Sequence, residues 1–295
     1  MVERYTRREV LAATLATTAG CGGVAGRSGE PVSILAAGSL QRALAEGLEP
    51  SLPVPLRVEA HGSAAVAHMV AEGGRDPDIV SLADAALFEG PLHPPWHAVY
   101  ASNAIVLAYN PDTEGGRRIR EAGPEGWWRP LLEDVSLGRT DPDQDPLGYR
   151  TLFALELAGR HYEDAPPLRE RLPERGQVYP ETALLSGFET DAIEAAFAYR
   201  TMAEQRGYEY VALPDRVDLS NPAHADWYAT TRYTLPDGRT VRGDLIRYAA
   251  TARRRDERVR QVFEAHVGGE YLANAGFVTP ERFPRYEGDV PDAFR

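Results

Sequence analysis

Short apolar runs alternate with longer segments that mix apolar and polar positions along most of the chain. The short runs predict strands and the mixed segments predict helices. Predicted strands cover residues 32–36, 56–60, 78–83, 103–109, 135–138, 208–213 and 227–235. Predicted helices cover residues 40–48, 64–72, 148–161 and 241–272, and residues 191–199 are predicted to run from helix into strand. This alternation indicates an α/β protein.

The N-terminal residues 1–30 are predicted to form a targeting segment rather than part of the fold. An arginine pair, Arg7-Arg8, precedes an apolar run that ends just before Cys21, and this pattern resembles a twin-arginine signal joined to a lipoprotein processing site. We therefore expect a signal peptide over residues 1–20, followed by a lipidated Cys21 and a flexible tether over residues 21–30. The alternative is a chance arginine pair before an ordinary helix, with a small buried cysteine.

Charge and cysteine content exclude several classes of protein. The chain has 44 acidic and 32 basic residues, and its formal charge of −12 argues against a nucleic-acid binder that needs a basic face. Every basic residue is arginine, which is typical of a protein living in concentrated salt; a GC-rich genome is the alternative explanation. The single cysteine excludes a disulfide within the chain. No apolar run reaches the roughly 18 residues that span a bilayer.

Two glycine–serine pairs, Gly38-Ser39 and Gly62-Ser63, each follow a predicted strand and open a predicted helix. Glycine permits close approach of the backbone, and serine offers a hydroxyl beside the free N–H groups of a helix N-terminus. Those N–H groups and the helix dipole favour an anion. Serine is also a common N-cap, so a structural role is the alternative for either pair. Two such junctions on neighbouring strands favour a shared oxyanion site between two lobes.

An acidic stretch carries Asp141, Asp143 and Asp145 at the spacing that opens a calcium loop. The calcium interpretation fails because Pro146 stands where that loop needs glycine, and Leu152 where it needs glutamate. From the residues alone, a solvated acidic loop is the simplest explanation.

The surrounding sequence, GRTDPDQDPLGYRTL, resembles the signature of the archaeal tungstate/molybdate-binding proteins of ABC importers. AAGSL, HGSAAV and AAFAYRTMAEQRGYEYVALPDRVDLSNPAHADWY are similar to further segments of that family in the same order, so the resemblance covers nearly all of residues 32–275. It implies a type II periplasmic-binding-protein fold, in which two α/β lobes joined by a hinge close on the oxyanion. The resemblance also implies that two carboxylates approach the tungsten or molybdenum atom of the oxyanion and raise its coordination number from four to six.

The resemblance also implies the ligand-binding residues, which are Gly38, Ser39, Ser63, Asp145, Pro146, Leu147, Glu181 and Tyr199. Asp145 and Glu181 would coordinate the metal, and Tyr199 would donate its phenolic O–H. Glu181 is placed by its position eighteen residues before Tyr199. Leu147 stands where the family often has cysteine, which is compatible with a role for its backbone N–H alone. The alternative for Tyr199 is an ordinary half-buried strand aromatic.

The physical logic agrees with these roles. Carboxylates inside an anion pocket repel sulfate or phosphate, whose central atom accepts no further ligand, whereas tungsten and molybdenum accept hard oxygen donors. The carboxylates would therefore act as a filter against the abundant oxyanions.

We expect the following organisation: residues 31–107 and 229–280 form lobe 1, residues 108–228 form lobe 2, and residues 281–295 form a C-terminal tail. The expected protein is a monomeric binding protein, not an enzyme, without a cofactor or a nucleic-acid partner. Anchored outside the cell membrane through Cys21, it would deliver tungstate or molybdate to an ABC permease and its ATPase.

Three alternatives stay open. A binding protein of the same fold could take another oxyanion (sulfate or phosphate) or ferric iron, although iron would leave the two glycine–serine junctions without a role. An extracytoplasmic hydrolase would need a nucleophile–base pair, and the chain has no G-x-S-x-G elbow. A structural surface protein would not respond to small anions.

Overall fold

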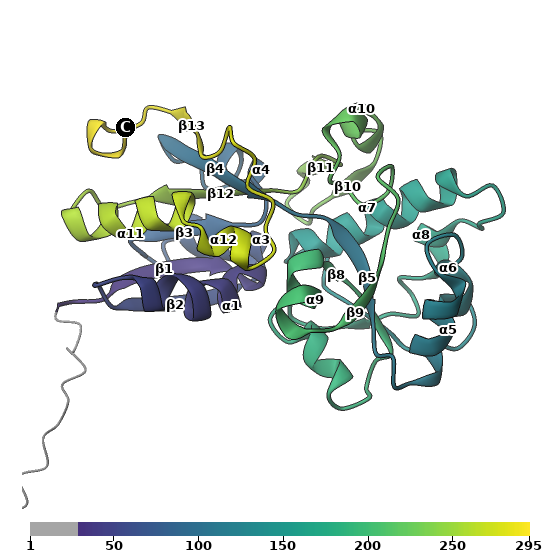
Figure 1. Cartoon of the computed structure of the whole chain (residues 1–295). Helices are drawn as coiled ribbons and strands as arrows, with labels where there is room; N and C mark the ends of the chain where they lie inside the picture. Colours follow the sequence, from purple (N-terminus) through teal and green to yellow (C-terminus); the bar gives the residue numbers. More distant parts are fainter. Residues whose placement is uncertain (1–28) are drawn as a thin grey trace, which may run out of the picture.

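Two α/β lobes lie side by side, each built around its own sheet (Figure 1). The computed structural model describes residues 29–295, so the predicted signal peptide and Cys21 lie outside the described residues. The sheet of lobe 1 has six strands in the order β13-β4-β12-β3-β1-β2. These strands are β1 (Val32–Ala37), β2 (Leu56–His61), β3 (Ile79–Leu82), β4 (Trp96–Ser102), β12 (Arg247–Ala252) and β13 (Arg285–Gly288). β1 pairs in parallel with β2 and β3, whereas β12 runs antiparallel between β3 and β4.

The sheet of lobe 2 has five strands in the order β7-β6-β8-β5-β9. These strands are β5 (Ile105–Tyr109), β6 (Leu137–Arg139), β7 (Gln177–Val178), β8 (Ala195–Tyr199) and β9 (Glu209–Ala212). β5 runs antiparallel between β8 and β9, and β6 is parallel to both β7 and β8. Each lobe therefore combines parallel and antiparallel pairs, and the prediction of an α/β fold is confirmed.

Helices pack against both sheets. Lobe 1 carries η1 (Gly38–Leu40), α1 (Gln41–Ala43), a π-helical turn η2 (Leu44–Leu48), α2 (Glu49–Ser51), α3 (Ser63–Ala71), α4 (Ala86–Glu89), α11 (Glu257–Gly268), α12 (Tyr271–Asn274) and η5 (Asp292–Phe294). Lobe 2 carries α5 (Glu114–Ala122), α6 (Trp128–Leu131), α7 (Pro146–His161), α8 (Leu168–Arg171), η3 (Leu184–Phe188) and α9 (Arg200–Arg206).

A small subdomain, formed by η4 (Pro222–His224), α10 (Ala225–Tyr228) and the hairpin β10 (Arg232–Thr234) and β11 (Thr240–Arg242), packs on lobe 2. Two arginines of lobe 2 hold it there: Arg160 donates to the Thr230 hydroxyl at 2.8 Å, and Arg169 donates to the Arg232 carbonyl at 2.8 Å. In Figure 1 this subdomain lies above α7, close to the place where the two lobes meet.

The longest helix, α7, begins where the sequence provides an N-cap. The Asp145 carboxylate accepts the Leu147 N–H at 2.9 Å, and Pro146 occupies the first helical position, where proline costs no hydrogen bond. Eleven residues of α7 are buried, so the helix that this cap begins is packed into the core of lobe 2. Asp145 is therefore held at the point where lobe 2 faces lobe 1.

Three predicted elements are wrong. Residues 191–194 form a turn and an extended segment before β8, not a helix, and residues 227–235 hold the end of α10 before β10. Residues 241–272, expected as one helical pattern, contain β11 and β12 before α11 and α12. The alanine-rich β12 favours a helix by intrinsic propensity, but pairing with β3 and β4 buries it as a central strand.

The structure places three of the predicted lobe limits differently. The limit after residue 228 falls between α10 and β10, inside the small subdomain that packs on lobe 2. The limit after residue 107 falls inside β5, whose partners are strands of lobe 2. The expected C-terminal tail contains β13, which pairs with β4 at the edge of the lobe 1 sheet. The strand at residues 96–102, which is absent from the prediction, is the partner of β13 and lies between it and β12.

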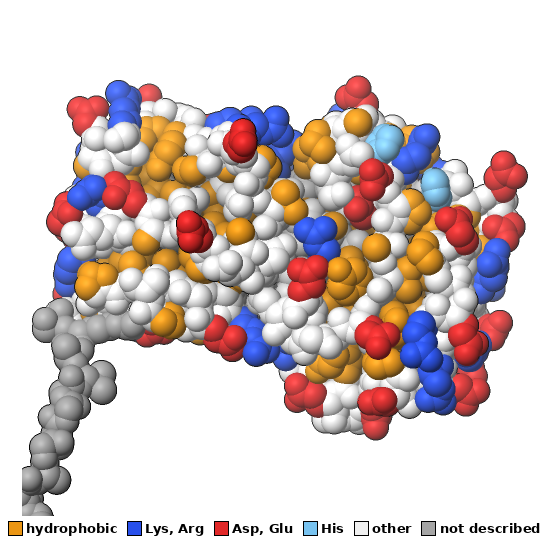
Figure 2. All heavy atoms as spheres, viewed as in Figure 1, with side chains coloured by type: hydrophobic (Ala, Val, Ile, Leu, Met, Phe, Trp, Pro, Cys, Tyr) orange, Lys and Arg blue, Asp and Glu red, His pale blue; other side chains and the backbone are white. Residues whose placement is uncertain are grey.

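The surface carries acidic and arginine side chains interspersed over both lobes in the view of Figure 2. Within residues 29–295, no helix has the combination of length and apolar character that crossing a membrane requires.

Candidate functional site

The predicted ligand residues come from both lobes and meet where the lobes face each other. Gly38 and Ser39 follow β1, and Ser63 begins α3. From lobe 2, Asp145 precedes α7 and Tyr199 ends β8. Glu181 lies between β7 and η3, and Pro146 and Leu147 form the first turn of α7. All eight residues are buried.

Both glycines of the predicted junctions allow the lobes to meet. A Cβ atom on Gly38 would stand 2.7 Å from Glu181 Oε2, and one on Gly62 would stand 2.5 Å from the Gln144 carbonyl oxygen. The same Gln144 carbonyl accepts the Ala65 N–H of α3 at 3.1 Å. A larger side chain at Gly62 would meet backbone and hold the lobes apart, whereas one at Gly38 would first displace the Glu181 side chain.

The two carboxylates predicted to bind the metal are buried with oxygens that lack partners. Asp145 and Glu181 are each 3% exposed. Asp145 Oδ2 and both carboxylate oxygens of Glu181 make no hydrogen bond with the described residues. Burying a charged group in this way is costly unless another group compensates for it.

Burial and mutual repulsion raise the pKa values of this pair. Burial raises the pKa of Asp145 to about 6, although the Leu147 N–H and the Thr140 hydroxyl oppose the shift. Burial first, and then the charge of Asp145, raise the pKa of Glu181 well above its usual range. Gly38 and Ser39 lie close enough to lower the pKa of Glu181 somewhat, but neither makes a hydrogen bond of normal geometry to it. The site therefore favours one or more protons on the pair when it contains no ligand.

Three hydroxyl groups near the carboxylates keep a proton available for donation. Ser63 Oγ accepts the Ala83 N–H at 3.0 Å, and Ser39 Oγ accepts the Tyr248 O–H at 3.0 Å. The Tyr199 oxygen accepts from Arg150 Nη1 at 2.7 Å. Each acceptor bond leaves the O–H of the accepting residue free to point at a ligand oxygen. Burial raises the pKa of the Tyr199 phenol well above its usual range, so this group stays a donor.

The backbone N–H of Leu147 already has a partner within lobe 2. This N–H, expected to face the ligand, donates to the Asp145 carboxylate and caps α7. Pro146 has no N–H and contributes the shape of this turn. The two residues thus fix the position of Asp145.

Two further buried residues, Arg150 and Tyr248, contact the predicted ligand residues, although the sequence did not predict them there. Arg150 is 3% exposed and brings a positive charge next to Tyr199 at the site. Tyr248, on the unpredicted strand β12, is fully buried and donates to Ser39. Arg150 lies five residues after Asp145 in the GYR segment, which was the one available signal; the Ala-rich strand gave none for Tyr248.

The remaining acids of the D-x-D-x-D stretch serve the loop itself. Asp141 accepts the Asp143 N–H at 3.0 Å, and Asp143 accepts the Tyr233 O–H at 2.6 Å. Within residues 29–295, no group of three or more His, Cys, Asp or Glu residues has a geometry that could hold a metal ion.

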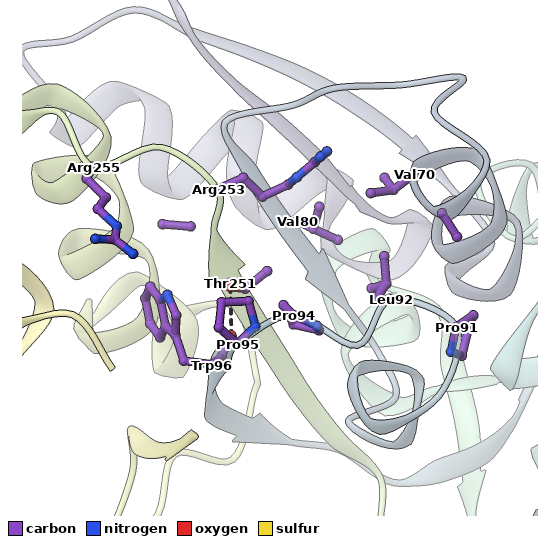
Figure 3. Close-up of a pocket in the computed structure, with 12 residues that line it drawn as sticks. Val70, Val80, Pro91, Leu92, Pro94, Pro95, Trp96, Thr251, Arg253 and Arg255 are labelled. Atoms are coloured by element: carbon purple, nitrogen blue, oxygen red, sulfur yellow. Dashed lines mark hydrogen bonds between the residues drawn. The ribbon is translucent and has the colours of Figure 1, made fainter. Parts of the chain in front are cut away.

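Two hollows differ in their relation to this site. A groove of about 380 Å³ is lined by Gly38, Ser39 and Glu181 and runs outward between α1 and α9. Another, of about 430 Å³, lies at the opposite end of the lobe 1 sheet, between Trp96, Leu92, three prolines and two arginines (Figure 3). Of these two hollows, only the first is lined by residues predicted to bind the ligand.

The chain matches the family described as bacterial extracellular solute-binding protein over residues 33–243. A Haloferax volcanii protein, named as a candidate ABC transporter molybdenum-binding protein, is 54% identical over 98% of this chain and 96% of its own length. The chain belongs to the extracellular solute-binding proteins. The molybdate/tungstate-binding protein WtpA of Thermococcus kodakarensis is 31% identical over 68% of this chain and 64% of its own length.

Solved structures confirm the fold of this solute-binding protein. The periplasmic molybdate-binding protein of Azotobacter vinelandii superposes with a TM-score of 0.59 at 15% identity, covering 85% of this chain and all of that chain. The sulfate-binding protein SubI of Mycobacterium tuberculosis gives 0.58 at 13% identity, covering 85% of this chain and 87% of that chain. These structures confirm the predicted type II periplasmic-binding-protein fold. Membership of the solute-binding family confirms a binding rather than an enzymatic role. Since the fold is common to molybdate and sulfate binders, the ligand must be argued from the site.

Proposed function

We propose that this protein captures tungstate or molybdate between its lobes and delivers it to an ABC permease with its ATPase. The observation that carries this proposal is the pair of buried carboxylates, because three of their four oxygens lack hydrogen-bond partners among the described residues. A tetrahedral oxyanion without Lewis acidity would meet repulsion there. A W(VI) or Mo(VI) centre accepts the same oxygens as additional ligands.

Each group has a distinct task in this proposal. Asp145 and Glu181 coordinate the metal from lobe 2. The hydroxyls of Ser39 and Ser63 donate to oxo groups from lobe 1, and Tyr199 donates from lobe 2. The nine-residue helix α3 adds the positive end of its dipole, which favours negative charge. Arg150 supplies the positive charge that partly balances two carboxylates and a dianion.

The names of the relatives support the same ligand. The Haloferax volcanii relative spans nearly the whole chain and is named for molybdenum, and the Thermococcus kodakarensis relative is named for both oxyanions. The carboxylate pair separates this site from one for sulfate or phosphate, whose saturated centres gain nothing from extra oxygen donors.

Calorimetric titration of residues 22–295 in molar KCl tests the proposal. We expect 1:1 binding of tungstate and molybdate and at least about 100-fold weaker binding of sulfate, a difference of about 2.7 kcal/mol or more. Equal affinity for sulfate would contradict selection by the carboxylates, although an oxyanion pocket would still be supported. Binding of none of the three anions would contradict the proposed function.

We further propose that the protein acts outside the cytoplasm as a monomer, held to the membrane by a lipid on Cys21. The extracellular character of the family supports the location, and the sequence around Cys21 supports the anchor. In cells that produce the full chain, Cys21→Ser is expected to move most of the protein from the membrane fraction to the soluble fraction, because the lipid supplies the membrane affinity. Mass spectrometry of the N-terminal peptide provides the check, and an unmodified Cys21 in the wild type would contradict the anchor.

A further inference from the structure

A cluster of polar side chains joins the lobes beside the ligand residues. Asp84, which follows β3 in lobe 1, accepts a hydrogen bond from the Tyr149 hydroxyl of α7 in lobe 2. The neighbouring Arg150 guanidinium lies 3.4 Å from the Asp84 carboxylate and donates to the Ala83 carbonyl at 2.6 Å. The side chain of Arg150 is 4% exposed and that of Asp84 is 12% exposed. These contacts are therefore shielded from solvent, where removing one partner of an ion pair leaves the other charge buried without compensation.

The cluster is continuous with two groups assigned to the ligand. The Ala83 N–H donates to Ser63 Oγ at 3.0 Å, while the Ala83 carbonyl accepts from Arg150. The same nitrogen of Arg150 donates to the Tyr199 oxygen. One chain of hydrogen bonds thus runs from Ser63 in lobe 1, through Ala83 and Arg150, to Tyr199 in lobe 2. The position of Arg150 depends on lobe 1, and the orientation of Tyr199 depends on Arg150.

We propose that Asp84, Tyr149 and Arg150 form a closure latch, in which Arg150 is a positioning residue that orients the Tyr199 hydroxyl only when lobe 1 has docked. The proposal deepens the function proposed above and rests on it for the identity of the ligand. A bound oxyanion that contacts Ser63 and Tyr199 favours the docked arrangement, and the latch in turn keeps both donors in place. Loss of the latch should therefore shorten the lifetime of the complex more than it slows its formation.

The substitution Asp84→Asn tests the contribution of the ion pair alone. The new amide oxygen can still accept the Ala86 N–H, which lies 3.1 Å from Asp84 Oδ1, and the amide NH2 can donate to the Tyr149 hydroxyl in place of the bond that Asp84 Oδ2 accepts. Both contacts can therefore persist, with the second reversed in direction, while the negative charge facing Arg150 is lost. We expect tungstate to dissociate at least about 10-fold faster, with an association rate within about 3-fold of the wild type. Asp164→Asn is the matched control, because Asp164 pairs with Arg129 on the surface of lobe 2 alone.

The distance between the lobes is a second measurement, and a change in local stability alone would not alter it. With Cys21 replaced by serine, cysteines introduced at the exposed positions Glu72 in lobe 1 and Glu163 in lobe 2 carry spin labels for distance measurement. Under saturating tungstate, the wild type and Asp164→Asn should give one short distance, and Asp84→Asn should add a longer one. Gly62→Ala, whose Cβ would clash with the Gln144 carbonyl, serves as the positive control for opening.

The outcomes distinguish the latch from the proposed function. Wild-type dissociation kinetics and a single short distance in Asp84→Asn would overturn the latch. If wild-type protein binds no tungstate, the proposed function fails, and the ligand-free distances then decide: a longer distance in Asp84→Asn than in the wild type upholds the latch, and equal distances overturn it.

Discussion

Replacing Asp145 by asparagine, or Glu181 by glutamine, is expected to lower the affinity for tungstate by about 100-fold or more, or about 2.7 kcal/mol. Both substitutions preserve size and leave an amide oxygen in place. They remove the negative charge that makes the carboxylate a strong ligand for a hexavalent metal. Both side chains are buried with unpartnered oxygens, so no water-exposed group nearby can take over their role.

Sulfate should respond in the opposite direction. Removing one buried negative charge lowers the repulsion on a dianion, so sulfate affinity should rise in the same variants while tungstate affinity falls. Calorimetry with both anions measures this inversion of preference. Asp141→Asn is the control, because it removes one charge from the same loop and keeps an oxygen that can accept the Asp143 N–H. Wild-type tungstate affinity in both isosteric variants would show that neither carboxylate contacts the ligand.

Local sequence patterns were sufficient for the parts of this site that one segment determines. Gly38-Ser39 and Gly62-Ser63 were found because a strand followed by a glycine and a helix start is visible within a few residues. Glu181 was placed only by its distance along the chain from Tyr199. The structure brings it against Gly38, where a Cβ atom would meet the Glu181 carboxylate.

Arg150 and Tyr248 could not be found in the same way, because their roles depend on contacts between distant segments. Arg150 contacts Ala83, which lies 67 residues away, and Tyr248 contacts Ser39, which lies 209 residues away. One arginine among 32 has no local feature that marks it as buried. For β12, alanine-rich composition favours a helix, and only pairing with β3 and β4 makes the segment a strand.

The same carboxylates that bind the ligand should destabilise the protein without it. Burial raises the pKa of Asp145 from 3.8 to about 6, which corresponds to about 3 kcal/mol at 1.36 kcal/mol per unit. The folded state holds the Asp145 proton more tightly than the unfolded state does, so protonation stabilises the fold. This stabilisation is fully present below about pH 4 and is lost as the pH rises through about 6. At pH 7–8 the ligand-free wild type therefore carries the cost of a buried charge.

Asp145→Asn should consequently raise the stability of the ligand-free protein at pH 7–8, by about 3 kcal/mol or roughly 5–10 °C in Tm. Asparagine is as good an N-cap as aspartate, so the start of α7 is preserved. The new amide N–H lies near Thr140, whose buried hydroxyl has no hydrogen-bond partner in the described part of the chain. Thermal unfolding in high salt between pH 4.5 and 8 measures the effect as the difference between variant and wild type.

The difference in Tm between Asp145→Asn and the wild type should shrink as the pH falls towards 4, since the protonated carboxyl no longer carries the cost of a buried charge. Saturating tungstate should reverse the order at pH 7–8, because a ligand stabilises only the protein that binds it. A pH-independent difference would mean that packing around Asp145, not its charge, sets the change in stability. The expected crossover instead identifies one carboxylate as the source of both the instability of the empty site and the affinity of the filled one.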